Sequence, residues 1–125
     1  MIEPTPLEAF LNDVASNKPT FALITSKTCQ PCKRVKPLFT AAKETFNDFA
    51  YFHELDAHEL PVEFRTERGI RSVPTLLMYK FGVEEHRLIN EADYIRVGEK
   101  IGEFITEYNE NMMGATRQIQ NGEEQ

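Results

Sequence analysis

The chain has 125 residues, of which 41% are hydrophobic, and its formal net charge is −6 with a pI near 5.1. This length suits one domain with a single core, and the composition is too apolar for a disordered chain. The negative charge disfavours nucleic acid and anionic lipid as partners, and no apolar run approaches the ~20 residues needed to cross a bilayer. The segment after Met1 has neither a basic region nor a long apolar run, so we expect a cytoplasmic protein without a secretory signal.

The first predicted element is a helix that begins after Thr5. A capping hydroxyl, Pro6 at the first helical position and the carboxylate of Glu8 together form a helix-start signal. Apolar side chains then recur at helical spacing, at Leu7, Phe10, Leu11 and Val14. The next segment, residues 20–26, is a short apolar run rich in β-formers and predicts a buried strand.

A second amphipathic helix is predicted to start near Cys29 and to contain Pro37. Its apolar stripe consists of Val35, Leu38, Phe39, Ala42 and Phe46. Residues 50–55 predict another strand, and residues 56–68 a loop with a short helix that Gly69 closes.

The remaining pattern predicts a hairpin and a final helix. Residues 75–81 form a third apolar strand, and Gly82 supplies a tight turn into a weaker strand over 83–90. A last helical stripe consists of Val97, Ile101, Phe104, Ile105 and Tyr108. Beyond it the sequence is polar and loses its period, so we expect a domain over residues 1–109 and a polar, flexible tail over 110–125. Strand–helix–strand units require parallel pairing and a hairpin requires antiparallel pairing, which together predict a mixed sheet sandwiched by helices.

The cysteines carry the strongest chemical signal. Cys29 follows a predicted strand and opens a helix, where unpaired backbone N–H groups and the helix dipole favour the thiolate and lower the pKa of a thiol. Lys27 and Lys33, with the neighbouring Arg34, add positive potential. Cys32 lies one helical turn further on and deeper. We therefore expect Cys29 to attack a substrate disulfide and Cys32 to resolve the mixed disulfide that forms.

These motifs together resemble the thioredoxin family. The run Thr28-Cys29-Gln30-Pro31-Cys32-Lys33 opens a helix, and Pro37 follows the second cysteine by five residues. About forty residues later, Val73-Pro74-Thr75 is similar to the cis-proline segment of that family, and Lys80-Phe81-Gly82 to its hairpin turn. The resemblance covers roughly residues 20–105. It implies an α/β fold, a thioredoxin-like three-layer α/β/α sandwich with a mixed central sheet.

The resemblance also implies roles for particular residues. Pro74 would be cis and pack beside the dithiol, and Val73 would offer its backbone N–H and C=O to an extended substrate. Thr28, Gln30 and Pro31 would contribute to the same substrate-binding surface. The chain would act as a protein-disulfide reductase on disulfide-containing proteins, and a thioredoxin-reductase-type, NADPH-dependent flavoprotein would return electrons to it. It would need no bound cofactor or metal and would work as a monomer.

Four positions depart from the usual family pattern. Thr28 stands where thioredoxins usually have tryptophan, which this chain lacks altogether, and Gln30 replaces the usual glycine. Leu23 occupies the place of a buried aspartate that helps the resolving cysteine lose its proton, and the lysine that usually neighbours it falls at about Phe52. Losing both charges together avoids an uncompensated buried charge. These departures concern turnover and substrate range more than the basic exchange reaction.

Three other interpretations of the cysteines remain open. Cys29, Cys32, His53 and His58 have the ligand types of a zinc site, but twenty residues separate the two pairs, against ~12–15 in a common zinc finger. We therefore expect the histidines to be surface residues. A purely structural disulfide would close only a small loop and stabilise little. The third alternative is a thioredoxin-like binding or regulatory module with weak redox activity.

Overall fold

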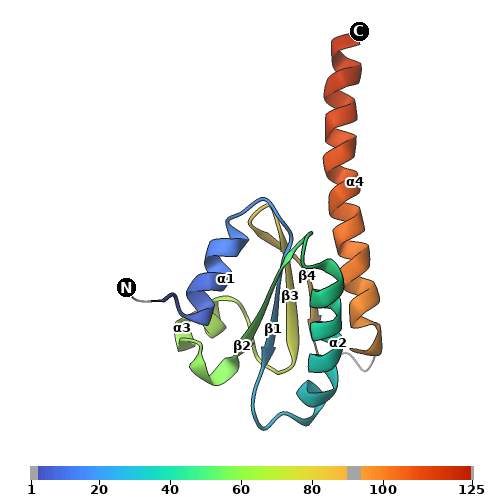
Figure 1. Cartoon of the computed structure of the whole chain (residues 1–125). Helices are drawn as coiled ribbons and strands as arrows, with labels where there is room; N and C mark the ends of the chain where they lie inside the picture. The colour runs from blue at the N-terminus through green and yellow to red at the C-terminus, as the bar shows by residue number, and fades with distance from the viewer. Residues whose placement is uncertain (1–2, 90–93, 125) are drawn as a thin grey trace.

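The computed structural model describes the backbone of residues 3–89 and 94–124, and the side chains of residues 3–89 and 95–112. The helices and strands follow the predicted order, with two additional 3₁₀ turns, η1 and η2 (Figure 1). In chain order they are α1 (Pro6–Val14), β1 (Thr20–Thr25), α2 (Gln30–Phe46), β2 (Tyr51–Asp56), η1 (Ala57–Glu59), α3 (Val62–Glu67), β3 (Thr75–Lys80), β4 (Val83–Ile89), η2 (Tyr94–Arg96) and α4 (Val97–Glu124).

The four strands form one mixed sheet in the order β2-β1-β3-β4. β1 pairs with β2 in parallel and with β3 antiparallel, and β3 pairs antiparallel with β4. The predicted mixed sheet is therefore confirmed. All six residues of β1 and all six of β3 are buried, as expected of central strands that helices cover on both faces.

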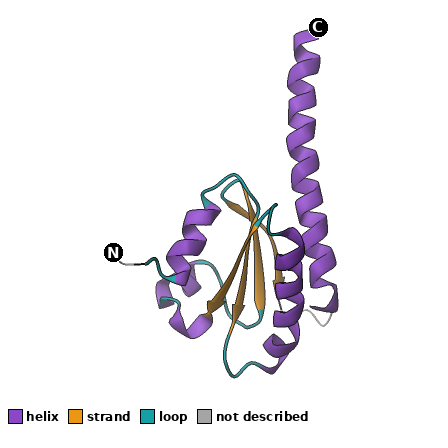
Figure 2. Ribbon diagram, viewed as in Figure 1, coloured by secondary structure: helices purple, strands orange, loops and turns teal. Residues whose placement is uncertain are grey.

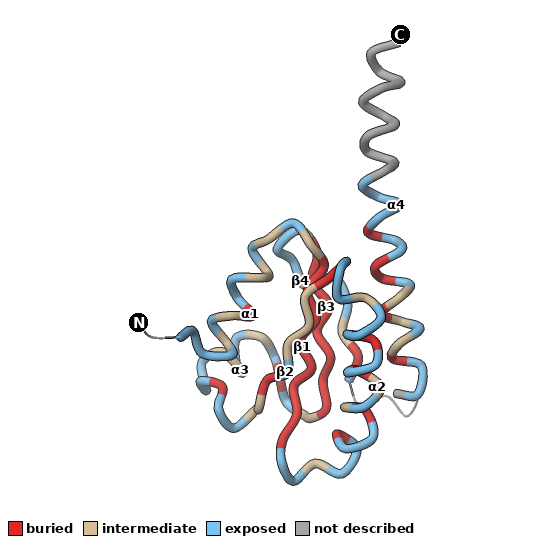
Figure 3. Tube along the Cα trace, in the orientation of Figure 1, coloured by how far each residue is buried: buried red, intermediate tan, exposed pale blue. Residues whose placement is uncertain are grey.

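Helices cover both faces of the sheet, which confirms the three-layer sandwich (Figure 2). Alternate residues of β1 point to opposite faces of the sheet. Phe21 and Leu23 belong to the core cluster that contains α2 and α4 side chains. Ala22 and Ile24 belong to the core cluster that contains α1 and α3 side chains. Figure 3 shows that the buried residues concentrate in the strands and on the inner sides of the helices. The predicted apolar stripes thus fill the two halves of the core, except for Leu11 of α1, which is 38% exposed.

The first helix begins as predicted. Thr5 caps α1: its hydroxyl accepts the backbone N–H of Glu8 at 3.1 Å, and the Glu8 carboxylate accepts the backbone N–H of Thr5 at 2.9 Å. The backbone N–H and hydroxyl hydrogen bonds from Thr5 also hold the pKa of the Glu8 carboxyl below its usual range. The reciprocal bonds satisfy donors that a helix start otherwise leaves unpaired.

The register of β1 and β3 brings two distant loops to one end of the sheet. Ile24, near the end of β1, pairs with Thr75 at the start of β3. The chain runs from β1 into the segment that contains Cys29, and Pro74 comes directly before β3. Antiparallel pairing therefore places the segment that contains Cys29 and the segment that contains Pro74 at the same end of the sheet.

Side-chain hydrogen bonds fix the loop between α3 and β3. Arg87 of β4 donates to the carbonyl oxygens of Arg68 at 2.7 Å and Gly69 at 3.1 Å, and Arg68 donates to the Tyr79 hydroxyl oxygen at 2.6 Å. Gly69 has φ +62°, so glycine ends α3 as the sequence predicts. Burial raises the pKa of Tyr79, while the Arg68 guanidinium acts in the opposite direction.

The β3–β4 hairpin turns through Phe81 and Gly82, with φ values of 55° and 78°. Two consecutive positive φ angles are the signature of a two-residue hairpin turn whose twist matches the strands. The predicted turn is confirmed, and both residues belong to the Lys80-Phe81-Gly82 segment that resembles the family's hairpin turn. The Phe81 ring packs against Tyr108 of α4, with ring centroids 5.2 Å apart.

The last helix is longer than its apolar stripe predicts. We expected the helical period to end near Asn109, whereas α4 continues to Glu124 and extends away from the sandwich (Figure 1). A helix can form without a buried face, so a prediction that relied on an apolar stripe did not include this polar continuation. The boundary of a 1–109 domain and the flexibility of the 110–125 tail stay predictions. Within residues 3–89 and 94–124, no helix combines the length and apolar character needed to span a membrane.

Candidate active site

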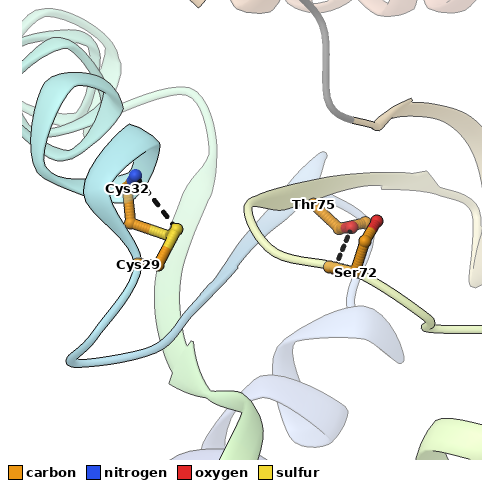
Figure 4. The surroundings of a disulfide bond; sticks show 4 residues. All are labelled: Cys29, Cys32, Ser72 and Thr75. Atoms are coloured by element: carbon orange, nitrogen blue, oxygen red, sulfur yellow. Dashed lines mark hydrogen bonds between the residues drawn. A yellow bond between two sulfur atoms is a disulfide. The ribbon is translucent and has the colours of Figure 1, made fainter.

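Cys29 and Cys32 form a disulfide at the start of α2, with their Cα atoms 5.3 Å apart (Figure 4). Cys29 is the N-cap residue of the helix and has an extended backbone. Its Sγ accepts the backbone N–H of Cys32 at 3.1 Å, and its own N–H donates to the carbonyl of Ser26 at 3.3 Å. The sulfur of Cys29 therefore lies where a backbone N–H that has no partner within the helix can stabilise negative charge, as the sequence predicts.

The two cysteines differ in accessibility. Cys32 is 1% exposed, whereas Cys29 is half-buried. An incoming disulfide can reach the outer sulfur far more readily than the inner one. This asymmetry is the one required of an attacking cysteine and a resolving cysteine.

The segment before β3 carries the second predicted feature of the site. The Val73–Pro74 peptide bond is cis, as the family resemblance implied. Thr75 donates its hydroxyl to the carbonyl of Ser72 at 2.7 Å, and Figure 4 shows this turn in the surroundings of the dithiol. Pro74 is buried and Val73 half-buried, and their part in binding a substrate stays a prediction.

The other residues predicted for the site lie around the dithiol on the protein surface. Those that are exposed are Lys27, Thr28, Gln30, Pro31, Lys33 and Arg34. They occupy the loop after β1 and the first turns of α2. A docking partner can therefore reach all of them, and their roles in binding and in tuning Cys29 remain predictions.

The two family positions that lack charge are filled by packed apolar side chains. Leu23 is fully buried in the core cluster beneath α2, where its neighbour in the sheet is Glu54 of β2. Phe52 stacks on Phe21 with ring centroids 5.1 Å apart and meets Phe39 edge-on at 5.5 Å. The acid and the lysine of the usual family pattern are thus replaced together by hydrophobic contacts, so neither position puts a charge into the core.

The histidines do not join the cysteines in a metal site. His53 pairs with Asp13 of α1, with Nε2 and Oδ2 2.7 Å apart, and its ring lies against Phe10. His58 is exposed in η1. Within the part of the chain that the structure describes, no three His, Cys, Asp or Glu side chains cluster to hold a metal ion. The surface prediction was right for His58 and wrong for His53, because strand alternation turns the His53 side chain toward α1.

Sequence reasoning missed a pocket that adjoins the dithiol loop. It has a volume of about 200 Å³ and is lined by Pro6, Thr25, Ser26, Lys27, Lys36, Glu54, Leu55, Asp56 and Glu59. These residues come from the ends of β1 and β2, from α2, and from the segments around α1 and η1. The available signal was that Lys36 follows Cys32 by four residues and so lies one helical turn along the same side of α2.

Comparison with known proteins assigns the chain to a family. The thioredoxin family model matches residues 2–107. The chain therefore belongs to the thioredoxin family, which its order of helices and strands, its Cys29–Cys32 pair and its cis Pro74 had indicated.

Individual relatives are distant. The chain is 25% identical over 92 residues to the chloroplastic thioredoxin M-type of Pisum sativum, covering 74% of this chain and 53% of the relative. It is 34% identical over 61 residues to thioredoxin-2 of Saccharomyces cerevisiae, covering 49% of this chain and 57% of that protein. The matched segments thus span little more than half the length of these relatives. The crystal structure of a thioredoxin from Nicotiana alata superposes with a TM-score of 0.64 at 26% identity, covering 77% of this chain and 81% of that one.

Proposed function

We propose that this protein is a thiol–disulfide oxidoreductase that reduces disulfides in other proteins. The observation that carries the proposal is the unequal pair at the start of α2, with Cys29 accessible and Cys32 buried beside it. A structural disulfide needs no such asymmetry. Membership of the thioredoxin family and the cis Pro74 segment at the same edge of the sheet support the same activity.

The geometry gives each cysteine a step. In the reduced protein, the Cys29 thiolate attacks one sulfur of a substrate disulfide, and the other substrate sulfur leaves as a thiolate that takes up a proton. The backbone N–H of Cys32 is positioned to stabilise charge on the Cys29 sulfur. Cys32 then loses its proton and attacks Cys29, which releases the second substrate thiol and leaves the Cys29–Cys32 disulfide. Two electrons have passed from the dithiol to the substrate.

The surface around the dithiol is the proposed docking site. Thr28, Gln30 and Pro31 flank the sulfurs on one side, and Val73 and Pro74 lie at the same edge of the sheet. An extended substrate segment would pair with the backbone of Val73, in the manner of an added strand. Lys27 and Lys33 would favour ionisation of Cys29 by their positive charge.

The proposal includes a cellular setting. A monomer in the cytoplasm would receive electrons from an NADPH-dependent flavoprotein of the thioredoxin-reductase type, and the chain itself would bind no cofactor. The negative net charge supports partners other than nucleic acid or anionic membranes.

Reduction of insulin disulfides tests this function. The pre-reduced protein, supplied with dithiothreitol as the electron source, is expected to accelerate insulin precipitation above the rate with dithiothreitol alone. Cys29→Ser is expected to abolish the acceleration, because it removes the attacking sulfur. A folded wild-type protein that gives no acceleration would instead support the alternative of a binding or regulatory module, which the loss of the buried acid at Leu23 makes worth testing.

A further inference from the structure

The pocket beside the dithiol loop has no part in the exchange steps described above. We propose that it is a subsite for the amino-acid group of a small disulfide, such as cystine, which bears both an ammonium and a carboxylate. This inference rests on the proposed function, because it names a class of substrate for the same pair of cysteines. The pocket of about 200 Å³ is large enough for one amino-acid group and too small for a folded protein segment.

The position of the pocket connects it to the reaction. Ser26 and Lys27 line it, and the Ser26 carbonyl accepts the backbone N–H of Cys29 at 3.3 Å. One wall of the pocket is therefore hydrogen-bonded to the backbone of the attacking residue. On the other side, Lys36 follows the resolving Cys32 by one turn of α2. The pocket thus borders the loop that leads to Cys29, although neither cysteine lines it.

The charges that line the pocket suit a zwitterion. Lys27 and Lys36 supply two ammonium groups, and Glu54, Asp56 and Glu59 supply three carboxylates. Among the residues that the structure describes, neither lysine forms an ion pair with any of these carboxylates. Asp56 accepts the backbone N–H of His58 at 2.9 Å, which fixes its carboxylate. Cations and anions that share a pocket without pairing are available to a ligand that carries both charges.

The residues between the charges add the remaining recognition groups. The Thr25 and Ser26 hydroxyls can hydrogen-bond to either end of an amino-acid group. Pro6 and Leu55 provide an apolar wall for its carbon atoms. Position 25 matters here because a bulky side chain at the end of β1 would occupy the space that threonine leaves open.

The reaction balances without any other component. The Cys29 thiolate attacks one sulfur of cystine, forming a mixed disulfide with one cysteine and releasing the other as a thiolate that is then protonated. Cys32 loses its proton and attacks the Cys29 sulfur, which releases the second cysteine. The protein dithiol is oxidised to the Cys29–Cys32 disulfide, and cystine is reduced to two cysteines.

Four small disulfides of different charge test the subsite. Cystine carries both charges, cystamine only ammonium groups, 3,3′-dithiodipropionate only carboxylates, and hydroxyethyl disulfide no charge. The second-order rate constant with which each disulfide oxidises the pre-reduced 125-residue protein is measured and divided by the rate constant of the same disulfide with dithiothreitol, which removes differences in intrinsic reactivity. We expect the normalised value for cystine to exceed that for hydroxyethyl disulfide by about fivefold, the effect of ion pairs at a partly exposed site.

Substitutions then separate the two charges. Lys36→Gln is expected to lower the normalised value for cystine about two- to fivefold and to leave cystamine unchanged, because only cystine has a carboxylate for Lys36. Glu59→Gln is expected to lower the normalised values for cystine and cystamine by a similar factor. It is expected not to lower the normalised value for dithiodipropionate. Lys33→Gln is the matched control, because it removes a charge from the same helix, next to Cys32 but outside the pocket. Lys33→Gln is expected to change the normalised values for all four disulfides by the same factor.

Different results would overturn the subsite alone or the proposed function as a whole. Equal normalised values for cystine and hydroxyethyl disulfide, or a Lys36→Gln effect that is the same for cystine and cystamine, would overturn the subsite while leaving the reductase in place. If Lys36→Gln does not fold, Lys27→Gln replaces it, with every value divided by that for hydroxyethyl disulfide to remove any effect on Cys29 ionisation. A protein that reduces none of the four disulfides, nor insulin, would contradict the proposed function and the subsite with it.

Discussion

Replacing Leu23 by aspartate would put an acid at the position where the family pattern usually has one. Leu23 is fully buried at the centre of the sheet, between Glu54 on β2 and Leu76 on β3. Truncating a buried leucine costs about 2–5 kcal/mol, and a poorly solvated carboxyl group adds to this. We therefore expect Leu23→Asp to lower the free energy of unfolding by about 4 kcal/mol or more, a large share of the ~5–15 kcal/mol of an ordinary domain.

The substitution Leu23→Asn is its matched control, because it has the shape and polarity of aspartate but does not ionise. Burial raises the pKa of a carboxyl group, so the folded state of Leu23→Asp favours the neutral acid. The stability of Leu23→Asp relative to Leu23→Asn is then greatest below the unfolded pKa of about 4 and falls as the pH rises through the folded pKa. Urea unfolding of both variants across this pH range measures the difference.

The same variant tests how the mixed disulfide resolves. Cys32 must ionise although it is 1% exposed, and desolvation opposes ionisation of a thiol. A carboxylate at position 23 can accept the proton, so we expect Leu23→Asp to release a preformed Cys29 mixed disulfide faster than wild type, and Leu23→Asn to give no gain. Stopped-flow release is followed between about pH 6 and 8. Equal rates for the folded Asp and Asn variants would refute the idea that a missing acid limits Cys32.

Four further outcomes are expected. Under limiting iodoacetamide, the reduced protein should be alkylated at Cys29 well before Cys32, and mass spectrometry that finds equal labelling would contradict the assignment of the nucleophile. The purified protein should contain far less than one zinc per chain and keep its circular dichroism in chelator, because its core does not depend on ligands. Pro74→Ala should slow insulin reduction or impair folding, and unchanged values of both would argue against a role for this segment. Thr5→Ala should lower the free energy of unfolding by about 1 kcal/mol through loss of the α1 cap, and no change in urea unfolding would show that the cap contributes nothing.

The fold was accessible from the sequence because several independent signals agree. The cap at Thr5 begins α1 as predicted, the apolar runs at residues 20–26 and 75–81 coincide with the buried central strands, and Gly82 lies in the hairpin turn. Each is a local signal that the tertiary structure reinforces. Among the residues that the structure describes, the end of α4 differs most from the prediction, because a polar helix beyond the core has no apolar stripe in its sequence.

The candidate site was accessible only in part. The spacing of Cys29 and Cys32 and their place at a helix start follow from local sequence, and the structure confirms both. The cis bond at Pro74 could be inferred only from family resemblance, because cis X–Pro bonds are a small minority in folded proteins.

The charged pocket required the structure itself. Lys36 and Glu54 look like ordinary solvated residues in the sequence, and only packing of α2 against the ends of β1 and β2 brings them together. The pairing of His53 with Asp13 has the same origin, because these residues are forty positions apart. Contacts between distant segments leave no periodic signal in a single sequence.

The central claim is that Cys29 attacks the substrate disulfide and Cys32 then resolves the mixed disulfide. Trapping tests it most directly: reduced Cys32→Ser is mixed with a disulfide-containing protein such as insulin, and covalent complexes are identified by mass spectrometry. The account predicts a stable mixed disulfide at Cys29, because the resolving sulfur is absent, and none at Cys32 in the reciprocal Cys29→Ser protein. A complex that forms through Cys32, or the absence of any complex with folded Cys32→Ser, would contradict it.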